Sequence, residues 1–345
     1  MDTGILFLSG QLQARETNLL NINRLDRMIG AKTAEDAFRV MVELQYSEYF
    51  DENTKPQSFA KIIEKGLLET KNMIVEATKN HKALQFLWRR FDLNNLKRAY
   101  KIKFFEKKDF IENFTEENGF DFLGNLTKED LENIVFKNKK SGDLPEEFTS
   151  VCFNVDNILD ENEDDQNSSL ESRFRNLEFA LDNAHFNYLY KVAKKQKDHF
   201  LKELFKFIVD SVNFRTLARF VLIFEKKLQN KAWINHGNFL NSETKDIQTF
   251  EDLEIWAKKT HFNSVLDKIK KDDSAEEKII KIEKGIDKLY REIVENSVMG
   301  EIASIQIPIR YFEKRLQNAR LLKFIMFAKF HGLSPDNIYK SLEHF

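Results

Sequence analysis

Helical spacing of apolar residues constrains the fold of this chain more than any other sequence feature. Two stripes are clearest, and in each the apolar residues follow one another in steps of three, four, three and four. The stripes comprise Ile279, Ile282, Ile286, Leu289 and Ile293 in one case, and Phe174, Leu177, Leu181, Ala184 and Tyr188 in the other. This spacing places each set on one face of an α-helix. No run alternates convincingly with the period of two expected of a strand, so the sequence predicts an all-α protein.

Proline is scarce enough to allow long helices. The chain has 345 residues but only four prolines, at positions 56, 145, 308 and 335. Because proline breaks helix interiors, such wide spacing leaves long segments free to be helical. The length is ample for a large core and suggests two or three domains.

A short polar motif recurs in three of the expected long helices. In each, an asparagine stands two residues before a basic residue, and in the first two an aspartate stands three residues before the asparagine. The motifs comprise Asp92, Asn95 and Lys97; Asp210, Asn213 and Arg215; and Asn318 and Arg320. The third has Arg315 in place of the acid.

The flanking positions keep the same register, which indicates an internal repeat. Asn213 and Asn318 lie 105 residues apart, as do the corresponding residues of the two apolar stripes. Two acids follow the same offset, because Glu178 pairs with Glu283 and Asp182 with Asp287. The first unit matches less tightly, since Ile63-Glu64-Lys65-Gly66 aligns with Ile282-Glu283-Lys284-Gly285 only if a four-residue gap is allowed. We therefore predict three related helical units, near residues 1–115, 116–232 and 233–345.

The role of the repeated asparagines has two interpretations at this point. An asparagine at a unit junction can cap a helix or bond to a neighbouring one. Repeated polar groups can equally line a shared axis and contact a partner. The sequence leaves both open.

Helix starts are marked by threonine or serine. Thr33-Ala-Glu-Asp36 and Thr249-Phe-Glu-Asp252 each combine a threonine cap with acids in the first turn, and Ser334-Pro335 places proline at a first helical position. The acidic segment from Asp156 to Ser169 is expected to be a solvated loop.

The sequence offers no catalytic chemistry that we can assign. It contains no GxxxxGK[ST] or GxGxxG phosphate loop, no HExxH and no GxSxG. Cys152 is the only cysteine, and Asp182 with His185 stands at a helical metal-ligand spacing, which we interpret as a polar surface pair. We therefore predict no catalytic, cofactor-binding or metal-binding residues and no cofactor.

Charge and hydropathy limit the partners. Lysine plus arginine (54) nearly balances aspartate plus glutamate (56), so no net field favours nucleic acid. No stretch approaches the roughly 18 apolar residues that a membrane span requires. We predict neither nucleic-acid binding nor a membrane span.

Several motifs along the chain resemble those of the C subunit of archaeal and bacterial V-type ATPases, whose eukaryotic counterpart is the d subunit. They are Ala14-Arg15, Leu19-Leu20, Thr33 to Asp36 and Tyr46 near the start, the two Asp-x-x-Asn-x-base helices in the middle, and Tyr311, Glu313, Asn318 to Arg320 and Lys329 to Leu333 near the end. Arg315 departs from the family pattern, which usually has an acid there, and the segment from Asp156 to Ser169 is longer than typical.

The resemblance implies three pseudo-equivalent helical domains arranged around an axis as a funnel. It implies a non-catalytic central-stalk connector that joins central-shaft subunits of the D/F type to the membrane rotor ring and transmits torque for ion transport. One copy would lie peripherally on the cytoplasmic side of the membrane, within a hetero-oligomeric ATPase. Candidate repeat-junction or partner-contact residues are Arg15, Asp92, Asn95, Lys97, Asp210, Asn213, Arg215, Asn318 and Arg320. A helical adaptor of another assembly and an enzyme with an unrecognised helical site are the alternatives.

Overall fold

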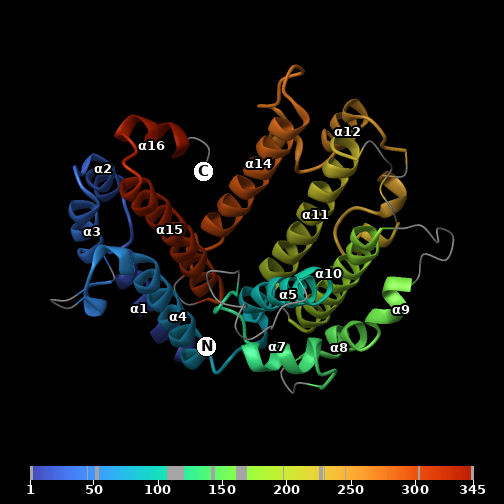
Figure 1. Cartoon of the computed structure of the whole chain (residues 1–345), viewed down its shortest axis with the longest axis horizontal. Coiled ribbons are helices and arrows are strands. Elements are labelled where there is room, and N and C mark those ends of the chain that lie inside the picture. Colours follow the sequence, from blue (N-terminus) through green and yellow to red (C-terminus); the bar gives the residue numbers. More distant parts are fainter. Residues whose placement is uncertain are drawn as a thin grey trace. The chain divides into compact units, whose positions relative to one another are not determined.

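The computed structural model confirms the all-α prediction (Figure 1). It describes residues 3–44, 46–50, 54–106, 120–140, 144–160, 169–196, 198–224, 228, 230–244, 246–301 and 304–342, and no strand occurs in these ranges. The chain forms two compact units, Met1–Leu84 with Val294–Phe345, and Gln85–Ile293. The three repeat units near 1–115, 116–232 and 233–345, and their arrangement as a funnel, stay predictions.

The first compact unit combines both ends of the chain. Its helices are α1 (Thr3–Glu16), α2 (Ile22–Gly30), α3 (Ala34–Val42), α4 (Phe59–Ala77), α15 (Gln306–Phe330) and α16 (Pro335–Leu342), with short 3-10 turns η1 (Ser47–Tyr49), η2 (Pro56–Ser58) and η3 (Lys82–Leu84). The long helix α15 packs against α1, α3 and α4, while α16 packs against α2 (Figure 1). Fully buried side chains from α1, α4 and α15, such as Leu12, Ile63 and Phe312, fill the space between these helices.

The second compact unit contains the middle of the chain. Its helices are α5 (Phe86–Lys101), the π-helix η4 (Ile102–Glu106), α7 (Lys128–Val135), α8 (Glu146–Cys152), α9 (Val155–Asp160), α10 (Leu170–Lys195), α11 (His199–Leu222), η5 (Asn230–Ala232), η6 (Asn241–Thr244), α12 (Phe250–Ala257), α13 (Asn263–Leu266) and α14 (Ala275–Asn296), whose last residues belong to the first unit. One apolar core joins α5 to α7 through α10, and a second joins α11 to α12 through α14.

The two apolar stripes face these two cores, as their spacing predicts. Phe174, Leu177 and Leu181 of α10 are buried in the first core. Ile282 and Ile286 of α14 are buried in the second. Burial of these stripes contributes roughly 1.5–3 kcal/mol for each fully buried large apolar side chain, before the entropy of ordering is counted.

The predicted helix starts at Thr33 and Thr249 are confirmed. The hydroxyl oxygen of each threonine accepts a hydrogen bond from the amide of the aspartate three residues later, at 3.1 Å for Asp36 and 3.2 Å for Asp252. Helix α16 begins at Pro335, as Ser334-Pro335 predicts. Thr127 caps α7 in the same way, although we did not expect this cap from the sequence.

The expected acidic loop is partly helical. Helix α9 spans Val155–Asp160, so the first residues of the segment, from Asp156 to Asp160, are helical although the charge pattern predicted a loop. Residues 161–168 of this segment lie outside the described residues. Among the helices that the structure describes, none has both the length and the apolar character needed to cross a membrane.

Candidate functional site

The first polar junction joins α5 to the segment that precedes α7. The side-chain amide of Asn95 donates to the carbonyl of Asp121 at 2.8 Å and accepts the amide N–H of the same residue at 2.7 Å. We call this two-bond arrangement an asparagine clamp. Asn95 is completely buried. Because one side chain satisfies both backbone groups of Asp121, the loop is tied to α5 at a defined residue.

Asp92 reinforces this junction one helical turn earlier. Its Oδ1 accepts the amide N–H groups of Asn125 at 2.6 Å and Leu126 at 2.8 Å, and its Oδ2 accepts Nη1 of Arg89 at 3.0 Å. Burial raises the pKa of Asp92, and the Arg89 charge and the two amide donors oppose that shift. The carboxylate is therefore buried with its hydrogen-bonding capacity used.

The second polar junction repeats this geometry on α11. Asn213 donates to the carbonyl of Ile234 at 2.8 Å and accepts its N–H at 2.9 Å, which is a second asparagine clamp. Asp210 accepts the backbone amide of Asn238 at 2.9 Å through Oδ1 and its side-chain amide at 2.8 Å through Oδ2. Burial raises the pKa of Asp210 to about 6, against the effect of these hydrogen bonds.

A glycine stands three residues after each clamped residue. A Cβ atom on Gly124 would lie 2.5 Å from Oδ1 of Asp92, and one on Gly237 would lie 2.1 Å from Oδ1 of Asp210. Both distances are too short for any side chain. Glycine at these positions lets the backbone approach the aspartate closely enough for the following asparagine's amide to bond to it.

The basic residues of the motifs form ion pairs with the acids of the 105-residue repeat. Lys97 Nζ lies 2.6 Å from Oδ1 of Asp182 on α10, and Arg215 Nη2 lies 2.5 Å from Oδ1 of Asp287 on α14. Burial raises the pKa of Asp182, and the Lys97 charge opposes this shift. Helices α5 and α11 are thus each bonded to a loop by an asparagine and to a second helix by a basic residue.

The interpretation of Asp182 and His185 as a surface pair was wrong. Asp182 pairs with Lys97, whereas His185 is buried among the aromatic rings of Phe148 and Phe186. Burial lowers the pKa of His185 to about 3. In the part of the chain that the structure describes, no cluster of histidine, cysteine, aspartate and glutamate has the arrangement of a metal site.

The third junction, on α15, keeps only part of the pattern. Lys323 pairs with Glu64 of α4 at 2.5 Å, and Glu64 is the acid that the sequence aligned with Glu178 and Glu283. Arg315, which replaces the aspartate, is buried with its guanidinium 4.9 Å from the ring centroid of Tyr46. A cation over an aromatic ring contributes about 2 kcal/mol when desolvated.

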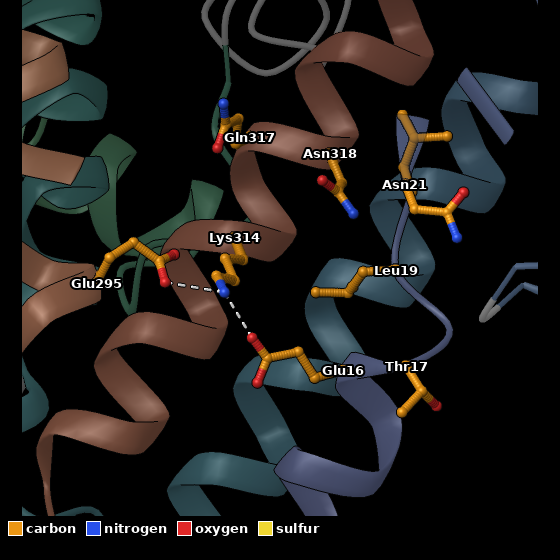
Figure 2. A pocket seen from close by; sticks show the side chains of 9 residues that line it. Glu16, Thr17, Leu19, Asn21, Glu295, Lys314, Gln317 and Asn318 are labelled. Carbon is orange, nitrogen blue, oxygen red and sulfur yellow. Dashed lines mark hydrogen bonds and ion pairs between the residues drawn. The ribbon is translucent and has the colours of Figure 1, made fainter. Parts of the chain in front are cut away.

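Asn318 faces a pocket of about 350 Å³ (Figure 2). The pocket lies between α15 and the segment that joins α1 to α2; its lining residues are Glu16, Thr17, Leu19, Leu20, Asn21, Glu295, Lys314, Gln317 and Asn318. Lys314 Nζ lies 2.6 Å from Glu16 and 2.9 Å from Glu295. Figure 2 shows the Asn318 side chain pointing from α15 toward the segment that carries Asn21. Within the described residues the side chain of Asn318 makes no hydrogen bond, so it is not a clamp.

The remaining candidates lie apart from these junctions. Arg15, at the end of α1, lies 3.8 Å from Glu69 of α4 with its side chain partly exposed. Arg320 of α15 is exposed. The structure therefore brings Asp92, Asn95 and Lys97 together at one junction and Asp210, Asn213 and Arg215 at another, but gives Asn318 and Arg320 different surroundings.

These features define an all-helical protein whose long helices are joined by repeated polar junctions. The family model described as "ATP synthase (C/AC39) subunit" matches residues 8–341, and the chain belongs to this family. This match confirms the resemblance to the C and d subunits of V-type ATPases. A comparison with individual curated proteins gave no match.

Proposed function

We propose that this protein is a non-catalytic central-stalk subunit of a rotary V-type ATPase or ATP synthase. It joins the central-shaft subunits to the membrane rotor ring and transmits torque between them. The observation that carries this proposal is the family match over residues 8–341, which spans nearly the whole chain. One copy would act in each complex, on the cytoplasmic side of the membrane.

The polar junctions support a mechanical role. A connector under torque must resist sliding of its helices, and directional bonds resist sliding better than apolar contacts, which are non-directional. Asn95 and Asn213 each fix a loop through two bonds, and Lys97 and Arg215 each join two long helices. The two asparagine side chains are buried, and leaving a buried backbone group without its partner costs about 1–3 kcal/mol, so opening these bonds is costly.

The candidate residues divide by their surroundings. Asp92, Asn95, Asp210 and Asn213 are buried and bonded within the chain, which favours a structural role for them. Asn318 and Arg320 face the pocket and the solvent, respectively, which favours contact with partners. We assign the shaft and ring contacts to surfaces with many moderate interactions, as is usual in protein interfaces.

Co-purification tests this assignment. An affinity-tagged chain is co-expressed with the shaft subunits and the rotor-ring subunit of the same organism, and the complex is separated by size. We expect the tagged chain to migrate with both partners at one copy per complex. A monodisperse chain with no affinity for either partner would overturn the proposal and would leave a helical adaptor of another assembly as the better explanation.

A further inference from the structure

At the other two junctions, a backbone residue of the same chain binds the asparagine side chain. At Asn318 there is a pocket instead. Asn95 and Asn213 each bind the N–H and the carbonyl of one backbone residue. Asn318 occupies the same position in its motif, two residues before a basic residue on a long helix. Its amide faces a pocket of about 350 Å³ and, among the described residues, has no hydrogen-bond partner.

A second residue that lines the pocket, Leu20, has unpaired backbone groups. Leu20 lines the pocket, and neither its N–H nor its carbonyl takes part in a hydrogen bond with any described residue. An extended polypeptide presents N–H and carbonyl groups on both of its edges. An extended segment in the pocket therefore meets two sets of groups that are unpaired within the described chain, the side-chain amide of Asn318 and the backbone of Leu20.

The charges in the pocket indicate that its occupant is neutral. The lining residues Glu16 and Glu295 carry two negative charges, and two positive charges balance them: Lys314, which lines the pocket, and Arg310, which lies outside the lining but pairs with both acids. These groups pair with one another at 2.6 Å for Arg310 with Glu16, 2.6 Å for Lys314 with Glu16 and 2.9 Å for Lys314 with Glu295. No net charge remains to bind a phosphate or a cation, whereas a peptide backbone is neutral and matches the amide.

We propose that this pocket binds an extended backbone segment of another ATPase subunit through an asparagine clamp made by Asn318. The identity of the partner rests on the function proposed above, while the clamp rests on the two internal examples at Asn95 and Asn213. A volume of about 350 Å³ falls within the range of pockets that hold ligands. The mode of binding is recognition of the segment's backbone N–H and carbonyl groups.

Photo-crosslinking in the assembled complex tests this binding. A Gln317→Cys variant, with its new thiol at the pocket, is labelled with a benzophenone maleimide. Burial raises the pKa of Cys152 to about 11, so the native thiol stays unreactive at neutral pH. The labelled chain is assembled with the other ATPase subunits and irradiated, and crosslinked peptides are identified by mass spectrometry. We expect crosslinks to one segment of one other subunit.

An Asn318→Asp substitution in the same background is the discriminating variant. Aspartate has nearly the same shape but cannot donate to a carbonyl, so we expect the crosslink yield to fall about tenfold. Because the side chain of Asn318 has no hydrogen bond within the described chain, the melting temperature should stay within about 1 °C of the parent. An undiminished or increased yield would overturn the clamp, and an increase would indicate a cationic occupant.

Assembly is scored separately, by co-migration of the labelled chain with the complex. A chain that assembles but crosslinks only to its own residues 17–21 would overturn the pocket proposal and leave the connector function standing. Such a result would mean that Asn318 clamps the segment before α2 of its own chain. A chain that does not assemble at all would overturn the connector function and, with it, binding of another ATPase subunit at this pocket.

Discussion

The side-chain amide of Asn213 binds both backbone hydrogen-bonding groups of Ile234, at 2.8 Å to the carbonyl and 2.9 Å from the amide. Asn95 does the same to Asp121, 118 residues earlier on an equivalent helix. The two clamps differ in sequence around the clamped residue but share the glycine and the asparagine that follow it. The same motif on two helices therefore fixes two loops in the same way.

Replacing Asn213 with leucine should destabilise the fold. The substitution leaves the buried N–H and carbonyl of Ile234 without partners, and each such group costs about 1–3 kcal/mol. We expect the free energy of unfolding to fall by about 2–4 kcal/mol in urea titrations. Asn318→Leu is the matched control, and it should change stability by less than about 1 kcal/mol because the Asn318 side chain makes no hydrogen bond within the described residues. Equal losses in the two variants would show that the clamp contributes nothing.

Replacing Gly237 with alanine should separate Asp210 from its loop. The new Cβ would lie 2.1 Å from Oδ1 of Asp210, so the loop or α11 must shift. Such overpacking costs about 1–3 kcal/mol, measurable as a lower urea midpoint. Gly10→Ala on α1 is the control, because no atom outside its own helix backbone and chain neighbours lies within 4 Å of its Cβ position. Alanine there should be neutral or stabilise by about 0.5–1 kcal/mol. A tolerated Gly237→Ala would contradict the close approach.

Asp210 should make stability depend on pH in a defined direction. Its pKa is about 6 in the folded protein and roughly 3.9 when unfolded, so between these values the folded state binds more protons. The contribution of this group to stability is therefore fully present below about pH 4 and is lost as the pH rises through about 6. The loss amounts to at most about 3 kcal/mol.

Comparison with Asp210→Asn isolates this effect from other titrating groups. The unfolding free energy of the native chain minus that of the variant should fall as the pH rises from 4 to 7, in urea titrations at fixed ionic strength. If this difference stays constant or rises with pH, the raised pKa of Asp210 does not contribute to stability.

The ion pair between Lys97 and Asp182 should show strong coupling in a double-mutant cycle. Lys97→Met leaves Asp182 partly buried without its counter-charge, and adding Asp182→Leu removes that charge. We expect a coupling energy of about 1–3 kcal/mol in unfolding experiments. The more exposed pair of Lys206 and Glu203 on α11 serves as the reference and should couple by less than about 0.5 kcal/mol. Similar coupling in both cycles would mean that burial does not strengthen the first pair.

The sequence predicts the long helices and the helix side of each polar junction, but not the loop residues that the asparagines bind. The apolar stripes on α10 and α14 and the caps at Thr33 and Thr249 follow from local spacing alone, whereas the equivalence of Asp182 with Asp287 follows from the 105-residue repeat. Thr127 was missed although Thr127-Lys-Glu-Asp130 has the same pattern as the other two caps. Local spacing succeeds because helix periodicity and capping depend on residues within one or two turns.

The other half of each junction depends on residues distant in sequence. The partners of Asn95 and Asn213 lie 26 and 21 residues further along the chain, so helix periodicity does not connect them. The two Gly-Asn pairs at Gly124 and Gly237 were the available signal, since each follows an Asp-x-x-Asn helix. Burial of His185 was also missed, because an apolar environment for a histidine arises only from tertiary packing.

Ion transport by a reconstituted complex tests the connecting role most directly. ATPase complexes assembled with and without this chain are placed in sealed vesicles, and ATP hydrolysis and ion uptake are measured together. We predict that omission abolishes ATP-driven uptake while the catalytic subunits still hydrolyse ATP, and that adding the purified chain restores uptake. Ion uptake that stays coupled to hydrolysis without the chain would contradict its role as the connector.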